Sequence, residues 1–238
     1  GYKKLNVSFQ SIFEDVLNQG TAASNNQGGS NPRQLGQGMA LAGVNVDFAA
    51  GEYVTGSSLD LAVQGQGLFV VSPDGGRTYL YTRAGNFNID SQGNLLSNGM
   101  QVYGLNASGS VTPISKLPSG TKTNYRWQAD GTLEFASDGI NFTATGYRVA
   151  LTYFSNAGGL TQAQGTAFAQ SVASGAAASF QAPGGAAGSL KPGQLEQSNV
   201  FYLNETINAL ELQRAMSGNL TMLRLASDII SQFISKLS

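Results

Sequence analysis

The sequence predicts a mainly β protein with a β-rich middle domain and a long C-terminal α-helix in a separate helical domain. Three observations predict it. Short apolar runs in the middle of the chain are separated by turn-forming pairs that end in Gly. Near residue 200 the apolar period changes to that of a helix. A polar stretch rich in Gly and Asn near the amino end indicates an extended connecting segment.

Composition narrows the functional classes. Only 11% of the 238 residues are charged and the net charge is −1, so no basic stripe is present to bind nucleic acid. The chain has no Cys and no His, which excludes disulfides, thiolate nucleophiles, Cys/His zinc sites and His-centred triads. We therefore expect no cofactor, no metal and no enzyme activity, although chemistry based on Asp, Glu, Lys or Ser–Lys passes this test.

The chain shows neither a membrane span nor a secretory signal. No apolar stretch approaches the ~20 residues that a membrane helix needs, so we expect no membrane insertion. Residues 1–6 lack the apolar core of a secretory signal. A start without Met indicates a trimmed or truncated amino end.

The first predicted region is a connecting segment over residues 1–52. Residues 8–17 carry apolar side chains at helical spacing and predict a short amphipathic helix, with Ser11 and Glu14 as a capping box. Residues 20–38 read as an extended loop. Apolar residues return with partial alternation over 39–48.

The second predicted region is the β-rich domain, residues 53–193. The turn pairs that predict its hairpins are Asp74-Gly75, Asn98-Gly99, Asp130-Gly131 and Asp138-Gly139. Residues 68–71 predict a fully buried strand, and alternation over 147–153 predicts a strand with one buried face. The small residues of 176–193 predict a flexible exit from the domain.

The third predicted region, residues 194–238, contains a helix of about 35 residues, or roughly 50 Å. Its apolar positions recur every three or four residues, which is typical of a helix with a buried face. That face packs either on the β domain or on something outside this chain. The candidate interface residues are Leu203, Ile207, Leu210, Leu212, Met216, Leu220, Leu223, Ile230, Phe233 and Leu237.

Several short patterns have structural explanations that outweigh chemical ones. Gly65-Gln66-Gly67 begins like a dinucleotide fingerprint but lacks the third Gly, so we expect a tight connection before a strand. Residues 90–94 lack the ligand spacing of a calcium loop and predict a hairpin turn. Asp60 is expected to make a structural hydrogen bond. Trp127 is expected to anchor the core or an interface.

Three stretches resemble the flagellar hook and rod family of axial proteins. The first is residues 55–69, TGSSLDLAVQGQGLF, and the second is residues 81–87, YTRAGNF, followed by GNL at 93–95. The third is residues 193–200, GQLEQSNV, with LQRA at 212–215 inside the expected helix. Together with the opening residues, these motifs are spread over nearly the whole chain.

The resemblance implies a self-assembling structural subunit of the flagellar hook or basal body. In this family the terminal helices form a coiled coil around a central channel, so the resemblance implies an N-terminal partner helix that this chain lacks. It also implies export by the flagellar type III apparatus and an extracellular location afterwards. The implied partners are copies of the chain, the rod, the hook–filament junction proteins and the hook cap.

Within the family, two functions stay open. Residues 31–38, NPRQLGQG, resemble short hook proteins, which favours a flexible hook that transmits torque, with residues 20–38 sliding between neighbours as the tube bends. The alternative is the distal rod, a straight drive shaft. A third hypothesis, from another class, is an extracellular carbohydrate-binding or adhesin β domain, which would not need the C-terminal helix.

Overall fold

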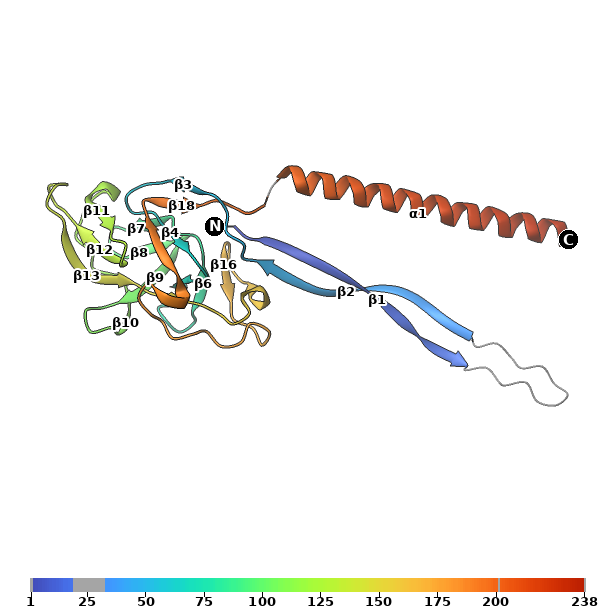
Figure 1. Ribbon diagram of the computed structural model, residues 1–238, viewed down its shortest axis with the longest axis horizontal. Coiled ribbons are helices and arrows are strands. Elements are labelled where there is room, and N and C mark those ends of the chain that lie inside the picture. The colour runs from blue at the N-terminus through green and yellow to red at the C-terminus, as the bar shows by residue number, and fades with distance from the viewer. Residues whose placement is uncertain (1, 19–32, 201, 238) are drawn as a thin grey trace. The chain divides into compact units, whose positions relative to one another are not determined.

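The chain folds as a mostly β protein with a C-terminal helix, as the sequence predicts (Figure 1). The computed structural model describes the backbone of residues 2–18, 33–200 and 202–237, with the side chains of residues 6–44 and of some helix positions outside the described part. Two compact units divide the chain between Asn199 and Val200. The first is called the globular unit below, and the second contains the helix.

Eighteen strands lie within the described residues: β1 (Lys4–Asn18), β2 (Arg33–Asp47), β3 (Tyr53–Thr55), β4 (Leu61–Gln64), β5 (Leu68–Ser72), β6 (Leu80–Thr82), β7 (Phe87–Ile89), β8 (Leu95–Ser97), β9 (Met100–Leu105), β10 (Val111–Pro113), β11 (Tyr125–Trp127), β12 (Thr132–Phe135), β13 (Thr143–Val149), β14 (Leu151–Thr152), β15 (Thr161–Gln162), β16 (Ala167–Ala169), β17 (Ser189–Pro192) and β18 (Gln194–Glu196). Short 3₁₀ turns lie at η1 (Lys122–Asn124), η2 (Ala157–Gly159) and η3 (Gly185–Ala187). The helix is α1 (Tyr202–Leu237), of 36 residues.

Twelve of the described strands form one sheet with the main path β11-β12-β13-β9-β5-β6-β16-β15. β14 pairs with β5, β10 with β9, and β7 and β8 extend from β9. The other described strands form three two-stranded sheets, β1–β2, β17–β4 and β18–β3. Every one of these pairings is antiparallel, which suits a chain that advances by hairpins.

The four predicted turn pairs are confirmed as connections between antiparallel strands. They join β5 to β6, β8 to β9, β11 to β12 and β12 to β13. At the tightest turn both central residues, Asn98 and Gly99, have positive φ angles of 49° and 82°, the conformation that an Asn-Gly pair favours. The hairpin predicted at residues 90–94 is also confirmed, because Asp90 Oδ1 accepts the amides of Gln92 and Asn94 between β7 and β8.

The predicted helix at residues 8–17 is wrong. These residues lie in β1, which pairs with β2 in a long antiparallel ribbon from Lys4↔Asp47 to Asn18↔Arg33 (Figure 1). Spacing of apolar residues along one segment cannot reveal a partner strand further along the chain, and that partner supplies the backbone hydrogen bonds here. The predicted loop 20–38 is wrong at residues 33–38, which begin β2, and its residues 20–32 lie outside the described residues.

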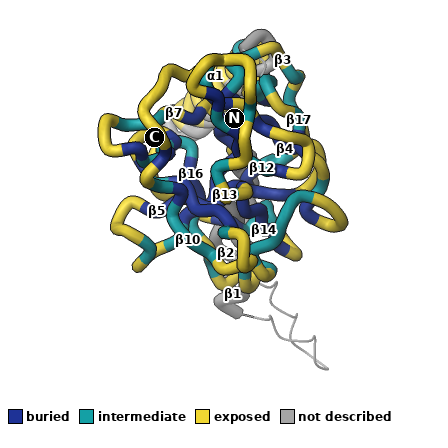
Figure 2. Tube along the Cα trace, turned by 90° about the vertical axis from the view of Figure 1, so that its left-hand side faces the viewer, coloured by how far each residue is buried: buried dark blue, intermediate teal, exposed yellow. Residues whose placement is uncertain are grey.

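The core of the globular unit consists of a large apolar cluster and a smaller one, and β5 contributes to both, through Phe69 and Leu68. Figure 2 shows its buried stretches, in dark blue, inside the unit and the exposed stretches, in yellow, around it. The predicted fully buried strand is confirmed, because all five residues of β5 are buried. Trp127 is a core anchor as expected: its ring packs edge-on to Phe87, and its Nε1 donates to Leu59 O at 2.8 Å.

The predicted alternation over residues 147–153 fails beyond Val149. Ala150 and Thr152 are fully buried, although the pattern assigned them to an exposed face. The strand breaks at Ala150, and β14 then pairs with β5 in the middle of the sheet, where both faces are covered. Thr152 tolerates this burial because its hydroxyl donates to Ala178 O at 2.7 Å.

The prediction that residues 176–193 form a flexible exit is wrong, because parts of this segment are buried, hydrogen-bonded and paired within the globular unit. Ala187 is fully buried, and its carbonyl accepts the amide of Gly67 at 2.8 Å. A Cβ added at Gly67 would lie 2.3 Å from that oxygen, so the Gly65-Gln66-Gly67 connection needs glycine for close backbone approach, as expected. Residues 189–192 and 194–196 then form β17 and β18.

Gly85 shows how tightly the family-like motif at residues 81–87 is packed. Its carbonyl accepts the amide of Leu61 at 3.0 Å, and a Cβ added there would lie 1.6 Å from Leu61 O. We predict that Gly85→Ala lowers the free energy of unfolding by about 3 kcal/mol, because backbone must move to make room. Urea unfolding followed by the fluorescence of Trp127, the single tryptophan, measures this.

Gly158 provides the matched control, since an added Cβ there would lie 3.5 Å from its nearest neighbour, Val46 O. Gly158→Ala should change the free energy of unfolding by less than about 0.5 kcal/mol. Equal effects of the two substitutions would contradict the packing assigned to Gly85.

Candidate assembly interface

A buried group of three charged side chains, here called the clamp, joins the beginning of the globular unit to its end. It consists of Lys3, Arg83 and Glu196. Lys3 Nζ lies 2.5 Å from Glu196 Oε1, and the side chains of both residues are fully buried. Lys3 Nζ also donates to Ala49 O at 2.8 Å, and Gly51 N donates to Glu196 Oε1 at 3.0 Å. The carboxylate therefore holds two segments from the amino-terminal part of the unit.

Arg83 is the second cation of the clamp. Its Nη1 lies 3.7 Å from Glu196 Oε2 and donates to Val63 O at 3.1 Å, while its Nη2 donates to Gly65 O. Burial lowers the pKa of both Lys3 and Arg83, and the nearby Glu196 carboxylate opposes this by favouring the charged forms. One buried carboxylate thus compensates the charge of two buried cations, so its removal would destabilise the folded unit.

Asn199 extends the clamp to the residue before the helical unit. Its Oδ1 accepts the amide of Lys4 at 2.9 Å, and its Nδ2 donates to Asp47 O at 2.9 Å. The chain's first residues, the end of β2 and the last residue of the globular unit are therefore fixed to one another. These contacts tie the base of the β1–β2 ribbon to the rest of the globular unit.

The three motifs that resemble the hook and rod family meet at the clamp. Residues 55–69 supply the carbonyls that bind Arg83, residues 81–87 supply Arg83 itself, and residues 193–200 supply Glu196 and Asn199. Sequence reasoning did not predict this meeting. The available signal was the presence of charged residues within motifs otherwise rich in Gly and apolar residues, in a chain with only 11% charged residues.

All ten candidate interface residues lie on α1. Four of them have described side chains, and all four are exposed: Ile207 by 46%, Leu210 by 54%, Met216 by 60% and Leu220 by 53%. The side chains of the other six lie outside the described part: Leu203, Leu212, Leu223, Ile230, Phe233 and Leu237.

A further apolar stripe on α1 was missed by the sequence analysis. Met222, Leu225 and Ile229 are three and four residues apart and are exposed by 70%, 55% and 58%. Leu225 follows Ile207 by eighteen residues, about five helical turns, so the two share an angular position on the helix. Met222 and Ile229 lie about 60° and about 40° around the helix from that position, toward Phe233. The apolar surface of α1 is therefore broader than the ten candidate residues alone define, and a helix apolar over most of its circumference is typical of one that contacts more than one neighbour.

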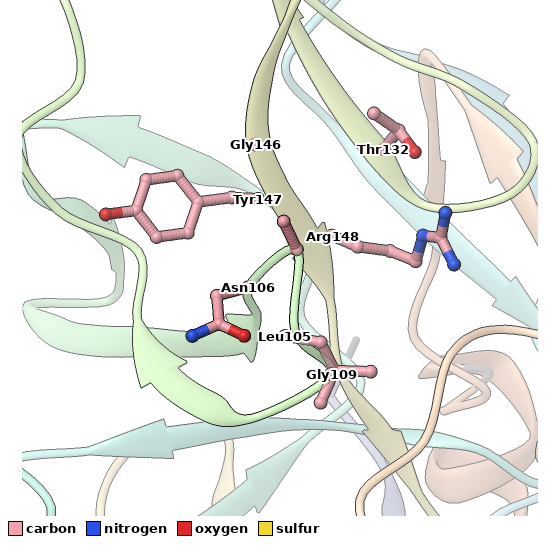
Figure 3. Close-up of a pocket in the computed structure, with 8 residues that line it drawn as sticks. Leu105, Asn106, Gly109, Thr132, Gly146, Tyr147 and Arg148 are labelled. Carbon is pink, nitrogen blue, oxygen red and sulfur yellow. The ribbon is translucent and has the colours of Figure 1, made fainter.

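The globular unit also carries an open depression at the edge of β13 (Figure 3). Tyr147 and Arg148 lie on opposite sides of the strand, and Asn106 and Gly109 approach from the turn after β9. Arg148 Nη2 lies 3.4 Å from Asp130 Oδ2, and both side chains are about half exposed. Arg148 is the charged residue of this lining, and its partner Asp130 lies outside it.

Within the described residues, no group of three or more Asp or Glu side chains is placed to bind a metal ion. In the same part of the chain, no helix is both long enough and apolar enough to span a bilayer.

Comparison with known proteins places these features in a family. Residues 62–122 match the model of the flagellar hook protein FlgE/F/G D1 domain. The flagellar basal-body rod protein FlgG of Bacillus subtilis is 30% identical over 237 residues, which cover 99% of this chain and 87% of that protein. This chain belongs to the flagellar hook and rod family of axial proteins. The resemblance stated from its motifs is thereby confirmed.

Other relatives cover the chain to different extents. The FlgG rod protein of Caulobacter vibrioides is 28% identical over 97% of this axial chain and 85% of its own length. The flagellar hook protein FlgE of Borreliella burgdorferi is 35% identical, but over 44% of this chain and 24% of its own length. Similarity to the rod proteins thus extends over both the globular unit, with its β1–β2 ribbon, and α1.

The clamp yields a direct prediction. Lys3→Met removes one partner of a buried ion pair and should lower the free energy of unfolding by about 3 kcal/mol, because Glu196 loses its closest counter-charge. Urea unfolding followed by Trp127 fluorescence measures the loss.

The control is Arg148→Met, which breaks the half-exposed pair with Asp130. That substitution should cost less than about 1 kcal/mol, since solvent screens exposed pairs. A Lys3→Met protein as stable as Arg148→Met would contradict the role given to the clamp.

Proposed function

We propose that this chain is a structural subunit of the flagellar basal-body rod that assembles with copies of itself into a torque-bearing shaft. The observation that carries the proposal is the similarity to a rod protein over 99% of the chain. The names of the relatives describe structural flagellar proteins, which supports an architectural role rather than catalysis. They support a location in the basal body or hook.

The hook is the second candidate, and two observations favour it. The hook proteins of Borreliella burgdorferi and Helicobacter pylori share 35% and 36% identity with this chain over 44% and 47% of its length. Residues 31–38 also have the pattern of short hook proteins. The rod is preferred because the rod proteins match nearly the whole chain, including the β1–β2 ribbon and α1, whereas the hook proteins match less than half of it.

The assembly interface in this proposal is the apolar surface of α1, formed by the ten candidate residues together with Met222, Leu225 and Ile229. Fully burying one exposed Leu, Ile or Met side chain contributes about 1.5–3 kcal/mol. Several such residues per subunit are enough to favour association over the entropy lost in ordering the chain. The surface is broad enough for α1 to contact more than one helix in a coiled-coil inner wall.

The partners in this proposal are further copies of the chain and neighbouring axial proteins, including other rod subunits and the hook. The hook–filament junction and hook cap proteins are partners under the hook alternative. The proposal also includes passage through the flagellar type III export apparatus, which the family resemblance implies.

Complementation distinguishes the rod from the hook. The full-length gene product, expressed separately in a rod-null and a hook-null strain of its own species, should restore basal-body completion and swimming in the rod-null strain alone. Electron microscopy of isolated basal bodies and swimming in soft agar measure this. Restoration in the hook-null strain alone would replace the rod by the hook. Failure in both would contradict an axial role.

Charged substitutions on α1 test the interface. Met216→Asp with Leu220→Asp places two carboxylates in the proposed contact, so polymer formation should fall by at least about 100-fold, the effect of losing roughly 3 kcal/mol of association energy. Sedimentation and electron microscopy of the purified chain measure polymer formation. Trp127 fluorescence checks that the globular unit stays folded.

The matched control is Gln213→Asp with Ser217→Asp, which adds the same charge at the same four-residue spacing on exposed polar positions of the same helix. If both double variants polymerised equally well, the apolar surface of α1 would not be the interface.

A further inference from the structure

Two short strands of the globular unit depend on the last part of that unit for their pairing. β4 pairs with β17, where Val63 faces Leu190, and β3 pairs with β18, where Val54 faces Leu195. In the described sheets, neither β3 nor β4 has another partner strand. Residues 187–199, here called the strap, therefore supply the strand pairing of residues 53–64.

Backbone hydrogen bonds outside the strands continue this dependence. Gly67 N donates to Ala187 O at 2.8 Å and Gly56 N donates to Gly193 O at 2.9 Å. In return, Gly193 N donates to Asp60 O at 2.9 Å. Gln197 N donates to Glu52 O at 2.8 Å, so the strap follows residues 52–67 along their whole length.

The strap also closes part of the apolar core. Leu61 and Val63 are fully buried in the same cluster as Ala187 and Leu190 of the strap. Without the strap, the side chains of β4 lose the surface that covers them. By contrast, β5, β9, β12 and β13 pair with one another and with their neighbours independently of residues 187–199. The globular unit therefore has a self-sufficient part and a part that needs the strap.

The charge of Glu196 links docking of the strap to the burial of Lys3 and Arg83. Glu196 is the one acidic residue of the strap sequence, and it carries the carboxylate that Lys3 and Arg83 share. Until it docks, Lys3 and Arg83 cannot be buried without leaving two cations uncompensated, which costs several kcal/mol per ion. A solvated, open arrangement of residues 2–5 and 52–67 is then favoured.

We infer that the strap is a closing device with Glu196 as its latch, and that the globular unit has an open form with the strap detached and residues 52–67 unpaired. Lys3 and Glu196 are 193 positions apart, so a chain made from its amino end acquires its latch late. The biological meaning rests on the proposed function: a subunit that passes through an export apparatus stays open until its strap is available.

Native-state hydrogen exchange of the full-length wild-type chain tests the device. Peptides covering 52–67 and 187–199 should share one opening event and exchange at least about tenfold faster than those covering 100–105 and 149–152 in low urea. Equal exchange in all four segments would overturn the inference, because the strap would then open only with the whole unit.

Substitution of the latch provides the second test. Glu196→Gln should speed exchange in 52–67 and 187–199 by at least a further ~10-fold relative to 100–105. The control is Glu134→Gln on β12. The Glu134 carboxylate lies 2.6 Å from Arg126, outside the strap and outside residues 52–67. This variant should leave the exchange rate of 52–67 and 187–199, relative to that of 100–105, unchanged. A latch variant that speeds exchange equally everywhere would overturn the inference.

Neither exchange result depends on polymer formation. If complementation fails while the strap segments open together, the proposed function is wrong and the closing device stands. If complementation succeeds and all four segments exchange together, the proposed function stands and the closing device is wrong.

Discussion

The globular unit depends on one buried carboxylate. Glu196 lies between Lys3 and Arg83, and its β18 strand and the neighbouring β17 provide the partners of β3 and β4. A buried charge must be compensated locally, because the low dielectric of the interior makes an unpaired ion far more expensive than an exposed one. The end of the unit is thus held to its beginning by electrostatics as well as by packing.

The two units of the chain have different properties. The globular unit buries its own apolar surface and closes with its own residues, whereas the described apolar side chains of α1 are largely exposed. A shaft subunit needs both properties, since a self-contained body keeps its shape under torque while an apolar helix provides adhesion between subunits. Asn199, hydrogen-bonded to Lys4 and Asp47, fixes the last residue of the globular unit.

Local chemistry predicted much of the fold. Asn98-Gly99 and the other turn pairs act within a few residues, so their hairpins follow from sequence. Asp60 makes the expected structural hydrogen bond, since its Oδ2 accepts the amide of Ser57 at 2.7 Å. The failures involve distant partners: β1 pairs with a strand beyond residue 32, and β17 returns to β4 more than a hundred residues earlier. The clamp was missed for the same reason, because its three side chains come from the start, middle and end of the unit.

The most direct test of the interface is the accessibility of α1 before and after assembly. The chain has no native cysteine, so Leu220→Cys and an exposed-loop control, Ser110→Cys, can each be labelled with a maleimide at a single site. If α1 joins the subunits, the thiol of the Leu220→Cys variant will react in the monomer and be protected at least about tenfold in the polymer, while the loop thiol reacts equally in both. Equal labelling of Leu220→Cys in monomer and polymer would show that the subunits are held together elsewhere.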